Sequence, residues 1–116
     1  MLEHQKEPSR LARVSSEIRK TLAPQLNELG RNNKLGIVSV TNVGISPDLR
    51  KATVYVSVFG NDQQAEKYIE LANQSSASLQ KIISKRLRLK RTPSLQFVLD
   101  DVLNTEARLK ELLRSP

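Results

Sequence analysis

The residues best placed to do chemistry are six cations in the stretch between Leu79 and Pro93. They are Lys81, Lys85, Arg86, Arg88, Lys90 and Arg91, and no Asp or Glu occurs from Leu71 to Leu99. A solvated helix face usually mixes charges, because opposite charges three or four residues apart stabilise a helix. Like charges without an acid repel one another, so we expect an acidic partner. A basic face that serves only solubility is the alternative, since charge runs are common.

Hydrophobic periodicity predicts how these cations are held. Four apolar residues fall at i, i+3, i+4 and i+8 on one helix face: Leu79, Ile82, Ile83 and Leu87. Three cations fall on the opposite face: Lys81, Lys85 and Arg88. Arg86 and Lys90 would fall on the apolar arc if the helix continued. We therefore end the helix near Arg86 or Leu87 and interpret residues 87–92 as a surface connector. Arg10 and Arg13, on an earlier helix, are expected to extend the basic face.

An enzyme is a second class to weigh. His4 is the only histidine and falls in a polar N-terminal segment. Asp100 and Asp101 are adjacent, so on a strand they point to opposite faces and cannot act as a pair. Glu66 and Glu70 lie one turn apart with no His or Cys near. The chain has no cysteine, and its four glycines form no phosphate-binding loop. We predict no catalytic residue, no metal site and no cofactor.

Composition bounds the fold and the partners. The chain has 116 residues, enough for one domain, and 38% of them are hydrophobic. We expect a flexible tail over residues 1–8, one domain over residues 9–113 and a short end over residues 114–116. The tail resembles neither a secretory signal nor a transit peptide. A net charge of +7 favours nucleic acid as the partner, with an acidic membrane surface or acidic protein second.

The first half of the chain predicts a helix and a hairpin. A stripe at helical spacing follows the cap candidate Ser9: Leu11, Val14, Ile18, Leu22, Leu26 and Leu29. Pro24 predicts a kink or restart near Ala23, and Gly30 predicts the helix end. Strands are expected over residues 35–45 and 52–59, joined by the tight Ser46-Pro-Asp48 turn as an antiparallel hairpin. Gly36 and Gly44 are candidate bulge or edge positions.

The second half predicts two helices, a strand and a final helix. Gly60-Asn-Asp62 caps a helix whose stripe is Ala65, Tyr68, Ile69 and Ala72. A polar interruption over residues 73–78 separates it from the basic helix. A third strand follows at Leu95, Phe97 and Leu99, and Asn104 or Thr105 caps a last helix through Ala107, Leu109, Leu112 and Leu113. The order predicts a two-layer α+β domain with helices packed on a three-stranded sheet.

Aromatic residues bear on how a nucleic acid would be recognised. There are four: Tyr55, Phe59, Tyr68 and Phe97. All occupy strand or helix positions that can be core. Reading of single-stranded bases uses exposed aromatic platforms. The scarcity of aromatic residues predicts recognition of the nucleic-acid backbone, of its shape, or of the surface of a larger assembly.

The predicted order matches the type II KH fold, and the details resemble the ribosome-binding factor A family. Three segments carry the resemblance: Arg10-Leu-Ala-Arg-Val14, Val43-Gly-Ile-Ser-Pro-Asp-Leu49 followed by Ala52-Thr-Val-Tyr-Val-Ser-Val58, and Arg86-Leu-Arg-Leu-Lys-Arg-Thr-Pro-Ser-Leu-Gln-Phe97 followed by Asp100-Asp101. The resemblance covers roughly Arg10 to Leu113, nearly the whole chain. The Ser-Pro-Asp-Leu hairpin and the run from Arg86 to Phe97 are each moderately specific, and the order and spacing of the segments make the combination strong.

The resemblance implies a function without catalysis. Proteins of this family bind the immature small (30S) ribosomal subunit and its 16S rRNA, act late in maturation, are linked to the 5′ end of that RNA and matter most in the cold. It further implies a monomer in the bacterial cytoplasm, or in the plastid stroma if a transit peptide has been removed. Ribosomal proteins and other assembly factors are further candidate partners. The alternative is a protein-interaction module, with the Leu-rich last helix as its surface and no direct RNA readout.

The family also implies a kink between the two middle helices. KH domains clamp nucleic-acid backbone with a Gly-x-x-Gly loop, which this sequence lacks. The family carries an Ala-x-Gly kink there instead, which we place on Ser75-Ser76-Ala77. Ala77 stands where Gly is usual. A kink needs a broken backbone bond and serine can bond its own backbone, so we expect the kink to persist.

Overall fold

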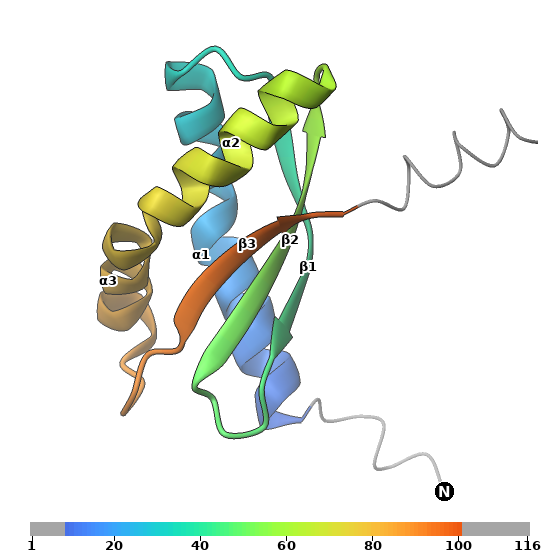
Figure 1. The fold of residues 1–116 in the computed structure, drawn as a ribbon. Coiled ribbons are helices and arrows are strands. Elements are labelled where there is room, and N and C mark those ends of the chain that lie inside the picture. The colour runs from blue at the N-terminus through green and yellow to red at the C-terminus, as the bar shows by residue number, and fades with distance from the viewer. Residues whose placement is uncertain (1–8, 101–116) are drawn as a thin grey trace, which may run out of the picture.

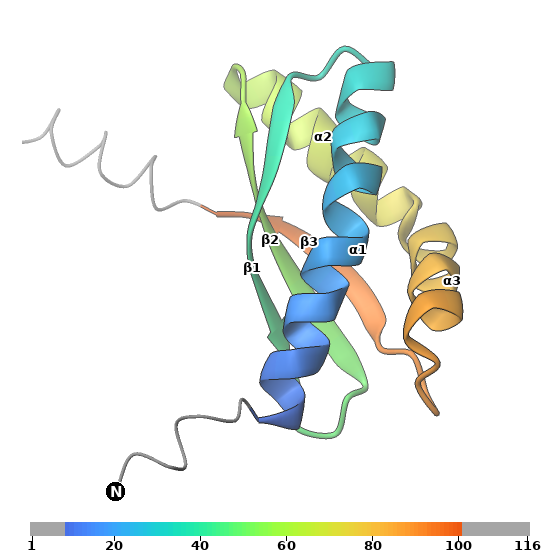
Figure 2. The same ribbon diagram turned by 180° about the vertical axis from the view of Figure 1, so that it is seen from behind.

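The computed structural model describes residues 9–100. The elements are α1 (Arg10–Asn32), β1 (Ile37–Ile45), β2 (Lys51–Phe59), α2 (Asp62–Gln74), α3 (Ser76–Leu87) and β3 (Ser94–Leu99). This is the predicted α-β-β-α-α-β order, and the three helices cover one face of the sheet (Figures 1 and 2). The predicted last helix from Asn104 or Thr105, together with Asp101, His4 and the tail of residues 1–8, lies outside the described residues.

The sheet has the order β1-β2-β3. β1 and β2 form the predicted antiparallel hairpin, with Ile37 opposite Phe59 at one end and Ile45 opposite Ala52 at the other. β3 runs parallel to β2, and its first residue, Ser94, pairs with Lys51. The loop that leads into β3 therefore lies beside the β1–β2 turn, at the same end of the molecule as the first turn of α1 (Figure 1).

The core lies between the sheet and the helices. Val54 and Val56 are fully buried and Phe97 is 1% exposed, as the alternation in the sequence predicts. Ile18, Leu22 and Leu26 of α1 pack against them from the helical layer. Burial of these side chains removes apolar surface from water, which is the main force that holds the two layers together.

The course of α1 differs from the prediction. The helix continues through Pro24 and Gly30 to Asn32, so the predicted restart near Ala23 and the predicted end at Gly30 are wrong. Pro24 is exposed, and a proline on the solvent side costs the helix one hydrogen bond without disturbing the core. Gly30 is buried at a close approach to the chain before β1. A Cβ there would stand 3.0 Å from the Gly36 carbonyl oxygen.

The bulge in β1 also falls elsewhere than predicted. The register with β2 shifts between Val40 and Asn42, so Thr41 is the extra residue and not Gly36 or Gly44. The Thr41 hydroxyl contacts the Tyr55 carbonyl oxygen at 3.2 Å and donates to the Asp100 carboxylate. A threonine therefore makes the irregularity favourable through its hydroxyl, without any need for glycine at this position.

The polar segment between α2 and α3 is a single joint. α2 begins at its cap Asn61, as predicted, and runs to Gln74. Two of the polar residues that suggested an interruption face the outer edge of β3. The Asn73 side chain donates to the Phe97 carbonyl at 3.0 Å and accepts from the Phe97 N–H at 2.9 Å. The Ser76 hydroxyl donates to the Leu95 carbonyl at 2.8 Å. These bonds satisfy backbone groups that an edge strand would otherwise leave unpaired.

Candidate nucleic-acid interface

The basic helix forms as the sequence predicts. α3 ends at Leu87, and its C-cap Arg88 adopts a left-handed conformation with φ of 49°. Leu79 and Ile83 are buried, whereas Lys81 and Lys85 are exposed. The left-handed turn at Arg88 directs the following residues away from the helix axis. The cations after Arg88 are therefore displayed by a loop and not by a continued helix face.

That loop and two other segments of chain meet to form a pocket of about 410 Å³, here called the hairpin-end pocket. It is lined by Arg10, Asp48, Leu49, Arg50, Leu89, Lys90 and Arg91. The segments are the start of α1, the β1–β2 turn and the loop before β3. They meet because β3 is parallel to β2 and begins beside it. Asp48 is the one acid that lines this pocket among the residues that the structure describes.

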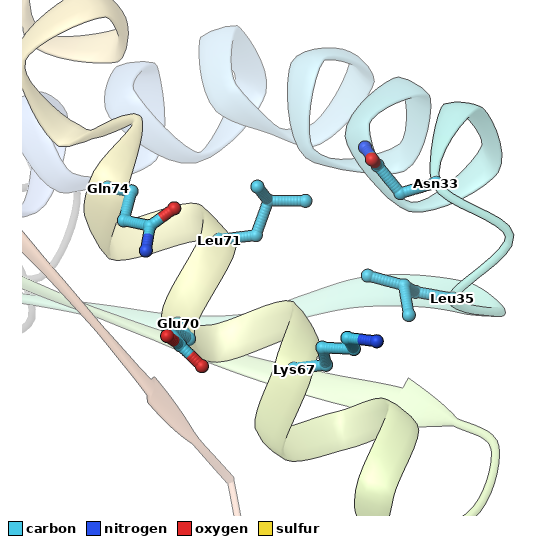
Figure 3. A pocket seen from close by; sticks show the side chains of 6 residues that line it. All are labelled: Asn33, Leu35, Lys67, Glu70, Leu71 and Gln74. Carbon is cyan, nitrogen blue, oxygen red and sulfur yellow. The ribbon is translucent and has the colours of Figure 1, made fainter.

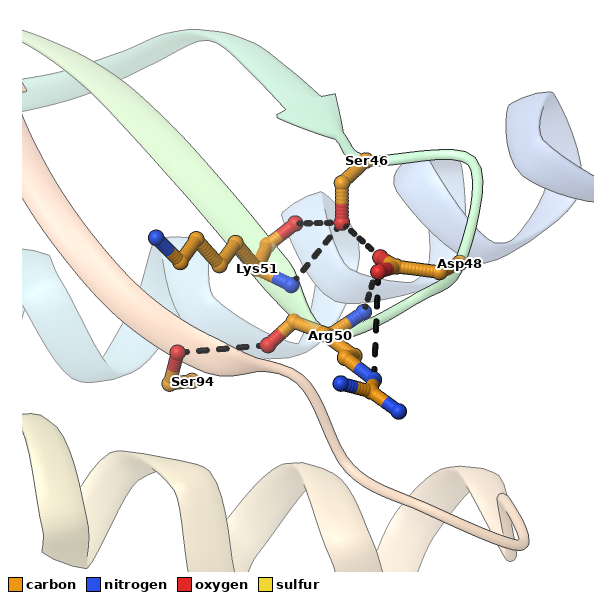
Figure 4. A network of polar contacts seen from close by, with 5 residues as sticks. All are labelled: Ser46, Asp48, Arg50, Lys51 and Ser94. Atoms are coloured by element: carbon orange, nitrogen blue, oxygen red, sulfur yellow. Dashed lines mark hydrogen bonds and ion pairs between the residues drawn. The ribbon is translucent and has the colours of Figure 1, made fainter.

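Hydrogen bonds fix the turn that forms one wall of the pocket (Figure 4). The Ser46 hydroxyl donates to Asp48 Oδ1 at 2.7 Å and accepts from the Lys51 N–H at 3.0 Å. The Arg50 N–H donates to the same Asp48 oxygen at 3.1 Å. The bond from Ser46, followed by the bond from the Arg50 backbone, holds the pKa of Asp48 below its ordinary value. Asp48 is therefore ionised at neutral pH.

Arg50 is also tied to β3. Its carbonyl oxygen accepts from the Ser94 hydroxyl at 3.2 Å (Figure 4). It also accepts from the Ser94 N–H at 2.9 Å. Its guanidinium Nε lies 3.8 Å from Asp48 Oδ2, and both side chains are more than half exposed. A pair this long and this exposed contributes little attraction. The Arg50 backbone is thus rigidly placed while most of its charge stays available.

A second basic feature lies between two helices. Lys85, Arg86 and Ile82 of α3 line a groove of about 420 Å³ together with Lys20, Thr21, Pro24 and Gln25 of α1. Lys20 lies 3.9 Å from Glu17 in an exposed pair one turn away. We call this feature the α1–α3 groove. It holds cations from two helices and, within residues 9–100, no acid lines it.

The structure divides the predicted RNA-binding set. Arg10, Lys90 and Arg91 line the hairpin-end pocket, and Lys85 and Arg86 line the α1–α3 groove. Arg13, Lys81 and Arg88 are exposed but line neither feature. Two cations in these features, Arg50 and Lys20, were not in the predicted set. Arg50 lies two residues after the predicted Ser46-Pro-Asp48 turn, so a parallel third strand would have placed it beside the basic loop. The orientation of that strand cannot be inferred from its alternation.

The predicted kink corresponds to a joint at Ser75. Ser75 has φ of −91° and ψ of 3°, and its N–H donates to the carbonyls of Leu71 and Ala72. Ser76 and Ala77 are the first residues of α3. No positive φ is required at the joint, which explains how serine and alanine can occupy it without glycine.

A third pocket bears on the enzyme alternative (Figure 3). It has a volume of about 320 Å³ and is lined by Asn33, Leu35, Lys67, Glu70, Leu71 and Gln74. Glu70 lies here with Lys67, and Glu66 is not among the lining residues. The pocket offers no nucleophile beside a base. Residues 9–100 also contain no group of three or more His, Cys, Asp and Glu side chains that could hold a metal ion.

The exposed aromatic residue lies away from the hairpin-end pocket. Tyr68 and Phe97 are buried and Tyr55 is half-buried. Phe59 is 58% exposed beside its partner Ile37, so the prediction that it could be core is wrong. β2 runs from Lys51 to Phe59, which at about 3.3 Å per residue separates the two ends by roughly 26 Å. The exposed ring therefore cannot stack a base that lies at the hairpin-end pocket.

The fold and this end of the molecule define the class of protein. An α-β-β-α-α-β domain with three helices on one face of a three-stranded sheet is a KH-like domain. In this one, four cations from three separate segments line the hairpin-end pocket. The sequence pattern of the family described as Ribosome-binding factor A matches residues 10–113. The chain belongs to the ribosome-binding factor A family. No helix within residues 9–100 is long and apolar enough to cross a membrane.

Individual relatives agree with this membership. The chain is 36% identical over 107 residues to Ribosome-binding factor A of Anaeromyxobacter sp. strain Fw109-5, covering 91% of this chain and 88% of that protein. A solution structure of a Thermotoga maritima protein described as a putative ribosome binding factor A is 34% identical, with a TM-score of 0.67 over 79% of this chain and 89% of that one. A Thermus thermophilus RbfA homology model, fitted into a cryo-EM map of a 30S–RbfA complex, is 23% identical, with a TM-score of 0.55 over 72% of this chain and 92% of that one.

Proposed function

We propose that this chain is a ribosome assembly factor that binds the immature small (30S) subunit and its 16S rRNA. It assists late maturation, including processing at the 5′ end of that RNA, and its contribution is largest in the cold. It acts by binding and not by catalysis, as a monomer without a cofactor, in the bacterial cytoplasm. Ribosomal proteins or other assembly factors can share the site.

The cations of the hairpin-end pocket and of the α1–α3 groove carry this proposal. They come from α1, α3, the β1–β2 turn and the loop before β3, and a single acid lines the two features among the described residues. RNA phosphates are the acidic partner that such a surface suits, since each contact releases condensed counterions. Family membership supplies the ribosome as the source of that RNA. The Thermus relative was fitted into a 30S complex, which agrees with a subunit surface as the target.

Binding to precursor small subunits at several salt concentrations tests the proposal. Affinity should fall steeply with salt, with a log–log slope of roughly 0.7–0.9 per phosphate contact. A triple variant with Lys81→Gln, Lys85→Gln and Arg88→Gln should bind more weakly and lower that slope by about two to three units. All three side chains are exposed, so the thermal melt should change little, since exposed substitutions usually alter stability by within ~0.5 kcal/mol each.

The matched control is Lys67→Gln on α2, at the opposite end of the molecule. It removes one exposed cation without touching either basic feature, so its binding should stay close to that of the parent. Equal binding of the triple variant and the parent across the salt range would show that the cations of α3 serve solubility alone.

A further inference from the structure

We infer that the hairpin-end pocket seats one phosphodiester group of an RNA backbone, gripped by Arg10, Arg50 and Arg91 with Lys90 beside them. This inference rests on the proposed function and deepens it. It assigns one fixed anchoring point to a surface that the sequence presents only as a run of charge. It also adds Arg50, which lies outside that run, to the binding residues.

The chemistry of the lining suits a single phosphodiester. Four cations and one carboxylate line the pocket, so it keeps a clear excess of positive charge. Guanidinium groups present planar forks of N–H donors that match the two unbridged oxygens of a phosphate. Its volume of about 410 Å³ lies within the range of ~300–1,000 Å³ typical of small-ligand pockets. That leaves room for a sugar on either side of the phosphate.

The backbone of Arg50 is fixed before any ligand arrives. Ser94 holds the Arg50 carbonyl through two hydrogen bonds, and Asp48 holds the Arg50 N–H. Leu49 and Arg88 adopt positive φ values of 60° and 49°, so each of the two loops that line the pocket turns at a left-handed residue. Such pre-organisation lowers the ordering cost of binding.

Asp48 has a positioning role that does not cancel the positive charge. Its Oδ1 is committed to Ser46 and to the Arg50 N–H within the turn. The other oxygen stays 3.8 Å from the Arg50 Nε, too far for a strong hydrogen bond. The carboxylate therefore shapes the turn, and among the described residues its ion pair is with Arg50 and not with Arg10, Lys90 or Arg91.

A minimal phosphodiester probe tests the site directly. We would titrate the full chain with dimethyl phosphate and follow backbone amide resonances. The amides of Arg50 and Arg91 should shift along a saturable curve, and the amide of Arg31, at the far end of α1, should not. Arg50→Gln should abolish saturation, whereas Arg31→Gln should leave it unchanged. Shifts that are uniform over the chain, or that fail to saturate, would overturn the assignment.

Precursor small subunits supply the second arm. The double variant with Arg10→Gln and Arg50→Gln should bind about tenfold or more weakly, since hydrogen bonds to charged groups are the stronger ones. The salt slope should fall by about one unit, with Arg31→Gln unchanged. Parent-like binding by the double variant, alongside weakened binding by the α3 triple variant, would overturn this inference and leave the proposed function intact. Failure of the parent to bind precursor subunits would overturn both. Binding to phosphatidylglycerol vesicles instead would reassign the pocket to a lipid headgroup.

Discussion

Asn73 should stabilise the fold out of proportion to its exposed position. It is an exposed polar residue near the end of α2, yet its side chain makes both a donor and an acceptor bond with the backbone of Phe97 on β3. Asn73→Ala removes both bonds, each with a net contribution of ~0.5–1.5 kcal/mol. The better helix propensity of alanine returns up to ~0.7 kcal/mol. We expect a net loss of about 0.3–2.3 kcal/mol in the free energy of unfolding.

Denaturant unfolding and amide hydrogen exchange measure this loss. For a domain of roughly 100 residues, 1 kcal/mol corresponds to a shift of roughly 4–8 °C in Tm. Exchange at the Phe97 amide should accelerate selectively, because its acceptor is removed. Gln74→Ala, on the next residue of the same helix, is the matched control and should stay within ~0.5 kcal/mol of the parent. The prediction fails if Asn73→Ala and Gln74→Ala have the same free energy of unfolding and the Phe97 amide keeps its protection from exchange. The Asn73 side chain would then not stabilise the edge of β3.

Three further predictions concern stability. Gly30→Ala should destabilise the chain by about 1 kcal/mol, because a Cβ 3.0 Å from the Gly36 carbonyl incurs an overpacking cost of ~1–3 kcal/mol that outweighs ~1 kcal/mol of helix propensity; a stabilised variant would refute the close approach. Val56→Asp should abolish the cooperative melt, because an unpaired carboxylate at a fully buried position costs several of the ~5–15 kcal/mol available. Asp48→Asn should destabilise the chain at neutral pH, and the difference should shrink as pH falls through the lowered pKa of Asp48, since a lowered carboxylate pKa stabilises the fold only above it. If the difference in stability between Asp48→Asn and the parent did not change with pH, it would not come from the charge of Asp48.

Hydrophobic periodicity predicted the elements because each helix and strand buries one face. The alternation in β2 correctly predicted that Val54 and Val56 are buried, and the fully buried Leu22 and Leu26 lie on the predicted stripe of α1. Glycine and proline misled the prediction in α1. Their local preferences were overridden by long-range packing, which needs a residue without a side chain where Gly30 meets Gly36.

The candidate site was only partly predictable, for a topological reason. The cations of residues 81–91 lie close together along the chain, so their positive charge is visible in the sequence. Their division between a pocket and a groove follows from the parallel pairing of Lys51 with Ser94 and from the packing of α1 beside α3. Neither the pairing of the strands nor the packing of the helices leaves a local pattern in the sequence. The same pairing explains why Arg50 joins the loop cations although it lies far from them in the chain.

Crosslinking of the intact protein to precursor small subunits, with the RNA positions mapped, tests the central claim most directly. Photoreactive groups placed at Leu89 and Gln25, beside the hairpin-end pocket and in the α1–α3 groove, should crosslink to defined positions of 16S rRNA. A group placed at Gln63, near the start of α2, should give few RNA crosslinks. Two results would contradict the claim that the hairpin-end pocket and the α1–α3 groove face the rRNA. One is RNA crosslinking from the Gln63 site alone, and the other is crosslinking from all three sites to ribosomal proteins only.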